Sequence, residues 1–164
     1  MRRIIFPLLL LLVAVACQPA TMEMTDAEKA AIADEVNAIN AEFWDVWRDG
    51  DFDRGMTYYY NSPDLAFAME GAVDYGYDQV DAKYRPNFAN VASQILRVTH
   101  SQTTVLAPDA VCIMETARFS QTDRDGVTTP ETDLALTSIW MLRDGEWKIH
   151  LAHESLPTPE TESM

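Results

Sequence analysis

Three side chains in the C-terminal two-thirds of the sequence have the chemistry needed for proton transfer: His100, Glu115 and His153. Each lies in a stretch of β-type pattern, so each can face either the protein interior or water. A carboxylate or an imidazole held in an apolar site can act as a general acid or base near neutral pH. We take Glu115 or His153 as the candidate base, with His100 and Tyr58 or Tyr59 polarising the substrate oxygen.

The same residues have a plainer interpretation. His153 can be a core histidine that bonds to a neighbouring strand or to Ser155, which is at least as well supported as a catalytic role. His100, Glu115 and His153 together could mimic a two-histidine, one-carboxylate metal site. Their spacing matches no metal motif, and residues 122–126 lack the remaining ligands of a calcium loop. We therefore predict neither a metal nor a cofactor.

Long segments of β pattern would position these side chains. Four of them cover residues 95–106, 110–120, 134–142 and 147–155, and a shorter strand is expected at 65–69. Asp144-Gly145 is a strong hairpin signal, and Pro108-Asp109 is a weaker one. The sequence therefore predicts two hairpins formed by consecutive long strands.

Counting outward from each turn gives the cross-strand pairs and the face that each residue occupies. The pairs on one face are Trp140 with Ile149, Ser138 with Leu151, Leu136 with His153, Gln102 with Glu115, and His100 with Ala117. Buried polar groups are costly unless they are paired or line a wet cavity. This face is therefore expected to line a pocket that includes His100, Gln102, Glu115, Ser138, Trp140 and His153.

Three helices are expected before these strands. The first begins at a capping box formed by Thr25 and Glu28, carries an apolar stripe, and ends at Gly50. The second runs from residue 51 or 52 to 60. The third covers 77 to about 90, with Pro86 bending or ending it.

The N-terminus resembles the export signal of a bacterial lipoprotein. Arg2 and Arg3 precede about a dozen apolar residues that end before Cys17, fewer than the ~20 needed to span a membrane. The expected division is residues 1–16 as signal, 17–25 as lipidated tether, 26–156 as folded domain and 157–164 as disordered tail. Because Gln18 is not the aspartate that favours inner-membrane retention, we expect a cell-envelope protein, on the periplasmic face of the outer membrane in a two-membrane cell.

The charge of the chain argues against two classes of binding partner. A net charge of −14 argues against nucleic acid and against adhesion to anionic lipid, because both would repel it. Contact with a membrane should therefore go through the lipid anchor alone. Cys112 is expected to be a packed thiol without a disulfide partner, and the outer sheet face with Ile139 and Met141 is the expected surface of a homodimer.

The order of elements resembles a known superfamily. Helices, one strand and four long strands, ending in the run from Asp144 to Ile149 and then His153-Glu154-Ser155, are similar to the nuclear transport factor 2-like superfamily. The similarity is strongest to its SnoaL-like and ketosteroid-isomerase-like members and to the association domain of calcium/calmodulin-dependent kinase. It implies an α+β fold, in which a cone-shaped curved antiparallel sheet wraps around about three N-terminal helices, and frequent dimers.

Two functional hypotheses follow, because this fold supports binding modules and enzymes alike. In the first, the conical pocket binds a small, partly apolar molecule between walls that include Trp44, Trp47, Tyr58 and Trp140, with His153 as an orienting donor. In the second, the domain is an isomerase, cyclase or dehydratase that uses a pocket carboxylate or histidine for proton transfer. We favour the first, because no aspartate maps onto the base of ketosteroid isomerase.

Overall fold

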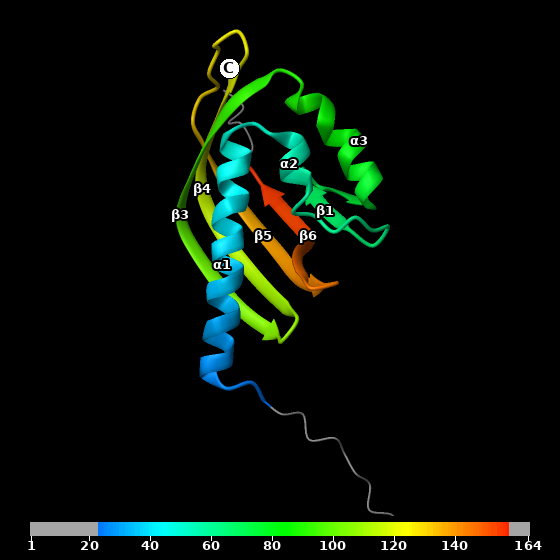
Figure 1. The fold of residues 1–164 in the computed structure, drawn as a ribbon. Coiled ribbons are helices and arrows are strands. Elements are labelled where there is room, and N and C mark those ends of the chain that lie inside the picture. Colours follow the sequence, from blue (N-terminus) through cyan, green and yellow to red (C-terminus); the bar gives the residue numbers. More distant parts are fainter. Residues whose placement is uncertain (1–22, 158–164) are drawn as a thin grey trace, which may run out of the picture.

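A long helix, α1 (Asp26–Arg48), lies against one side of a curved sheet (Figure 1). The computed structural model describes residues 23–157, so the predicted signal, Cys17, most of the tether and the tail from 158 lie outside the described residues. The predicted capping box is present, since the Thr25 side chain accepts from the backbone N–H of Glu28 and the Glu28 carboxylate accepts from that of Thr25. No helix within the described part of the chain is long and apolar enough to cross a membrane.

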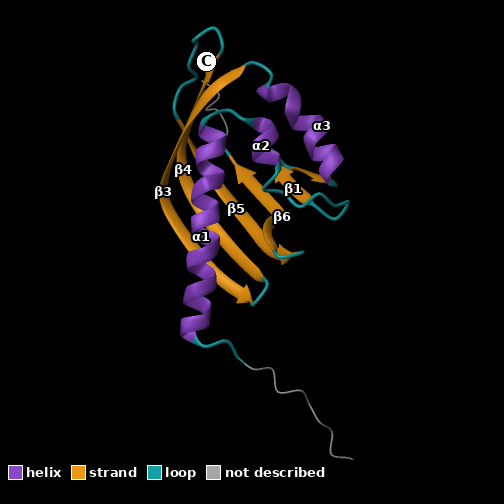
Figure 2. Ribbon diagram, in the orientation of Figure 1, coloured by secondary structure: helices purple, strands orange, loops and turns teal. Residues whose placement is uncertain are grey.

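Six strands form one sheet in the order β2-β1-β6-β5-β4-β3 (Figure 2). They are β1 (Ala66–Met69), β2 (Ala72–Tyr75), β3 (Val91–Ala107), β4 (Ala110–Asp123), β5 (Thr132–Arg143) and β6 (Glu146–Ser155). The predicted α+β class, with a curved sheet around N-terminal helices, is confirmed. The expectation of a wholly antiparallel sheet needs one correction, because β1 pairs in parallel with β6.

Strand β2 was not predicted. It forms a tight hairpin with β1, and Glu70 and Gly71 at the turn have φ values of 53° and 78°. This left-handed conformation suits a two-residue hairpin turn. The hairpin widens the sheet beyond the four long strands and extends the surface on which the helices pack.

The second helix is shorter than the sequence predicts. Helix α2 covers only Phe52–Met56, and the tyrosines that follow lie alongside β6. The backbone N–H of Tyr60 donates to the carbonyl of Ile149 at 2.9 Å, and that of Ile149 donates to the carbonyl of Tyr58 at 2.8 Å. Tyr59 is thereby held in the core with only 5% of its surface exposed.

The third helix, α3, covers Tyr77–Phe88 and contains Pro86 in its last turn, so the predicted helix ends two residues early. Figure 1 shows α2 and α3 beside the end of α1 that is farther from the N-terminus. The helices enclose a core rich in aromatic rings. Gly55 allows α2 to approach α1 closely, because a Cβ there would lie 2.6 Å from a ring carbon of Trp47.

Irregular residues in the long strands decide which side chains face the helices. In β6, Trp140 pairs with Ile149 but Ile139 pairs with Leu151, so His150 is an extra residue that forms a bulge. In β3, similar shifts make Thr99 and Leu106 extra residues. Because strand side chains alternate with a period of two, each extra residue turns the residues beyond it, counted from the hairpin turn, to the opposite face.

Candidate functional site

A cavity of about 450 Å³ lies between the helices and the sheet. Nearly half of the residues that line it are aromatic, and they come from α1, α2, α3 and the strands: Phe43, Trp44, Trp47, Phe52, Tyr59, Phe67, Tyr84, Phe88 and Phe119. Most of the others are aliphatic, including Leu96, Leu134, Leu136 and Leu156. A volume of this size falls within the ~300–1,000 Å³ typical of small-molecule sites.

Besides the tyrosine hydroxyls and the two indole N–H groups, four polar side chains among residues 23–157 line the cavity: Asn87, Gln94, Gln121 and Glu154. Asn87 is exposed at the C-terminal end of α3, so the cavity reaches the surface there. None of the described lining residues is a lysine, an arginine or a histidine. The walls therefore offer a large apolar surface, a few uncharged polar groups and one carboxyl.

Glu154 is that carboxyl. It lies on β6 directly opposite Leu136 of β5, and both side chains line the cavity. Among residues 23–157, no side chain or backbone N–H donates a hydrogen bond to it and no cation pairs with it. Burial without compensating partners raises the pKa of Glu154 from its ordinary 4.5 to about 7.

Tyr59 lies in the same wall of the cavity. Burial raises its pKa well above 10, and the negative charge of Glu154, with a smaller effect of Tyr84, adds to the rise. Tyr59 thus stays a neutral phenol at physiological pH. A carboxyl that titrates near neutrality beside a phenol is a combination that can accept or donate a proton.

Glu115, the strongest candidate from the sequence, has different surroundings. It is 6% exposed on β4, and its oxygens accept hydrogen bonds from Asn40 Nδ2 at 3.0 and 3.1 Å and from Trp44 Nε1 at 2.7 Å. Asn40 and Trp44 are one turn apart on α1. Glu115 therefore fastens α1 to the sheet and does not line the cavity.

The other predicted pocket residues divide into four groups. Trp44 and Trp47 line the cavity, as expected. Ser138 and Trp140 are inward and almost fully buried, but the Trp140 indole donates to Ser138 Oγ at 2.9 Å and neither side chain lines the cavity. Tyr58 packs against Phe43 with ring centroids 5.7 Å apart, and it is Tyr59 that lines the cavity.

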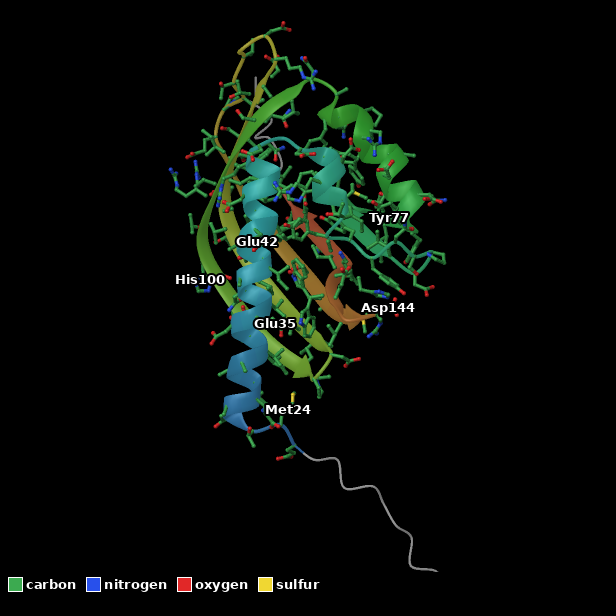
Figure 3. All side chains as sticks on the ribbon, viewed as in Figure 1. Met24, Glu35, Glu42, Tyr77, His100 and Asp144 are labelled. Atoms are coloured by element: carbon green, nitrogen blue, oxygen red, sulfur yellow. The ribbon has the colours of Figure 1, made fainter. Side chains whose placement is uncertain are left out.

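The predicted inward orientation of His100, Gln102 and His153 is wrong, because all three are exposed. Figure 3 shows His100 on the side of β3 that faces away from α1. The extra residue Leu106 reverses the faces of His100 and Gln102, and the extra residue His150 reverses that of His153. Since Glu115 is buried behind α1, these residues do not converge on a common acid–base or metal site.

Sequence reasoning missed Glu154 and Asn40. Alternation of side chains along β6 without a bulge predicts that Glu154 lies on the solvent-facing side of the sheet. The bulge at His150 turns Glu154 inward. Asn40 had a usable signal: it lies four residues after Val36 and four before Trp44, so it shares the buried face of α1. A polar residue on such a face calls for a buried partner, which is Glu115.

The curved sheet, the N-terminal helices and the apolar cavity between them define a nuclear transport factor 2-like domain. A sequence model of the SnoaL-like domain family matches residues 36–159. The chain belongs to this family. No curated protein is similar enough to this chain to count as a match.

Solved structures of the superfamily share the fold. A suspected dehydratase from Streptomyces avermitilis superimposes with a TM-score of 0.67 at 17% identity, covering 79% of this chain and 98% of that one. The association domain of CaMKII from C. elegans gives 0.64 at 15% identity, covering 80% and 99%. A superfamily protein from Salmonella enterica gives 0.63 at 19% identity, covering 85% and 98%.

Proposed function

We propose that the domain binds a small, partly apolar molecule in the cavity between its helices and sheet. The observation that supports this most directly is the cavity itself, which stays open although nearly half of its wall is aromatic. A structural core of this composition would gain by collapsing on itself. Burial of an apolar ligand releases about 25 cal/mol for each Å² removed from water, so these walls can supply most of the affinity.

Binding can be tested with an uncharged fluorescent probe, N-phenyl-1-naphthylamine, whose emission rises in an apolar site. We expect saturable binding of one probe to the protein. Gln121→Trp places a bulky ring at the cavity wall and should abolish the signal. Gln102→Trp is the matched control on the exposed outer face and should bind normally; no saturable signal, or equal loss in both variants, would refute the proposal.

Enzymatic proton transfer is the second candidate function, favoured by the raised pKa of Glu154 beside Tyr59. In this scheme the Glu154 carboxylate removes a proton from the carbon next to a ketone, and the Tyr59 hydroxyl donates a hydrogen bond to the ketone oxygen. Exchange of deuterium from D₂O into 2-tetralone, followed by NMR, would reveal the step. The rate should exceed that of buffer at the same pH and fall to background in Glu154→Gln.

Export and lipid anchoring form a further part of the proposed function. They are supported by Arg2 and Arg3, the apolar run and Cys17 in the sequence. A Cys17→Ser chain should lose incorporation of radioactive fatty acid and leave the membrane fraction. An unlabelled Cys17→Ser chain that stays in that fraction would contradict the lipid anchor.

We also propose that the domain forms a homodimer through the outer face of its sheet. Ile139 lies there between Cys112 of β4 and Leu151 of β6, and Met114 is a near neighbour. Leu151 is 39% exposed and Met114 46%. Light scattering should give a dimer for the wild type and a monomer for Ile139→Lys, whereas a wild type that is monomeric at micromolar concentration would exclude this surface.

A further inference from the structure

Glu154 has a property that the proposed binding function does not explain. A carboxyl group in an apolar wall is normally compensated by donors or by a cation, because an isolated buried charge is costly. Glu154 has neither among the described residues, although Gln94 and Gln121 line the same cavity. Its oxygens are therefore available to a group that enters from outside.

The lining shows which kind of group would complement it. Among the described residues, no basic side chain lines the cavity. Two indoles and two phenols do: Trp44, Trp47, Tyr59 and Tyr84. Aromatic faces attract cations, more strongly in a site from which water is excluded. A cation in this cavity would meet both the rings and the one carboxylate.

The charge of the whole chain acts in the same direction. A net charge of −14 creates a negative field that raises the local concentration of cations and repels anions. A ligand with a carboxylate or a phosphate would have to enter against this field and would then face Glu154. An anionic ligand is therefore disfavoured twice.

Resting on the proposed function, we infer that the cavity is specific for an organic cation: an ammonium group that pairs with Glu154, attached to an apolar body that fills the aromatic part of the cavity. The competing chemistry is a neutral ketone or ester that accepts a hydrogen bond from the protonated Glu154. The two differ in the form of Glu154 that they need, so they respond to pH in opposite directions.

The cation requires the ionised carboxylate. Burial alone raises the pKa of Glu154 to about 7, and the titratable groups that interact with this wall, Tyr59 and Tyr84, remain neutral below pH 10 because burial raises their pKa values as well. Affinity for a permanently charged cation that prefers the carboxylate form of Glu154 about tenfold should therefore increase roughly eightfold from pH 5.5 to 8.5 and level off above the Glu154 pKa. A neutral ketone would bind more tightly at the lower pH.

Two probes of the same shape isolate the effect of charge. Benzyltrimethylammonium carries a permanent positive charge, and neopentylbenzene replaces its nitrogen by carbon. Binding to the full chain is followed by quenching of tryptophan fluorescence, since Trp44 and Trp47 line the cavity, and by calorimetry. At pH 8.5 we expect the cation to bind roughly tenfold more tightly than its neutral counterpart.

Two variants locate the effect. Glu154→Gln should remove the preference for the cation and its pH dependence, while neopentylbenzene still binds. Glu35→Gln makes the same change of charge at an exposed position on α1 (Figure 3) and should leave the preference intact. A charge preference that survives in Glu154→Gln, or that falls equally in Glu35→Gln, would overturn the inference.

The outcomes also separate this inference from the proposed function. If both probes bind with equal affinity, or if affinity for the cation rises as the pH falls, the ligand class is wrong but the binding cavity stands. If neither these probes nor N-phenyl-1-naphthylamine binds, the binding function fails and the inference fails with it.

Discussion

Two carboxyl groups lie on the helix-facing side of the sheet, and they differ in what surrounds them. Glu115 is 6% exposed and accepts three hydrogen bonds from Asn40 and Trp44. Glu154 is partly exposed, lines the cavity and accepts none from the described residues. The hydrogen bonds of Glu115 are satisfied within the protein, and they hold α1 against the sheet. Glu154 has no hydrogen-bond or ion-pair partner among the described residues. Hydrogen-bond saturation, and not burial alone, therefore separates the structural carboxylate from the candidate functional one.

The largest expected effect tests the structural half of this comparison. Glu115→Leu keeps a similar volume but leaves the indole N–H of Trp44 and the amide of Asn40 buried without their acceptor. Since each unsatisfied buried donor costs ~1–3 kcal/mol and bonds to a charged group are lost as well, the free energy of unfolding should fall by about 4 kcal/mol. Urea denaturation measures this, and a loss below about 1 kcal/mol would show that Glu115 does not fasten α1.

The next effect has the opposite sign and concerns Glu154. Its pKa of about 7 in the folded state lies above the ordinary 4.5, so ionisation opposes folding. The free energy of unfolding should decrease as the pH rises from 4.5 to 7 and remain low above pH 7. Glu154→Gln removes this term, so at pH 8 the variant should be more stable by about 3 kcal/mol.

The same denaturation curves at pH 4 provide the control. Glu154 is protonated in the folded state and mostly protonated in the unfolded state there, so the wild type and Glu154→Gln should have equal stability to within about 0.2 kcal/mol. Glu35→Gln should match the wild type at both pH values, because Glu35 is exposed. A Glu154→Gln protein that is less stable than the wild type at pH 8 would mean that Glu154 has a stabilising partner.

A smaller effect separates the two roles of Trp44. Its indole N–H donates to Glu115 and its ring lines the cavity. Trp44→Phe should therefore lower the free energy of unfolding by about 1–2 kcal/mol more than Trp47→Phe. Trp47 also lines the cavity, but its indole N–H has no hydrogen-bond partner among the described residues. Equal losses in the two variants would show that the Trp44 to Glu115 bond contributes nothing.

The fold was predictable because its signals are local. The capping box at Thr25, the apolar stripe of α1 and the Asp144-Gly145 turn each depend on a few neighbouring residues, and all three appear in the structure. The hairpin register was also correct from the turn as far as Trp140 with Ile149. Beyond that pair the predicted register was wrong by one residue, because His150 forms a bulge.

The site was less predictable because it depends on bulges. The extra residue at His150 coincides with the place where Tyr58 and Tyr60 bond to Ile149. That contact joins Tyr59 to Ile149, about ninety positions farther along the chain, and the local alternation of side chains gives no sign of it. One displaced residue exchanged His153 for Glu154 in the interior, so the candidate site changed although the fold did not.

The smallest expected effect tests this exchange directly. His153 is exposed on the outer face, opposite Thr137 of β5 and Ala68 of β1, whereas its neighbour Glu154 lines the cavity. His153→Ala should change the free energy of unfolding by less than about 0.5 kcal/mol, as surface substitutions usually do. It should leave the affinity for N-phenyl-1-naphthylamine and for benzyltrimethylammonium unchanged, while Glu154→Gln alters the second. If His153→Ala weakens either probe, or costs as much as a buried truncation, β6 continues without a bulge and His153, not Glu154, faces the cavity.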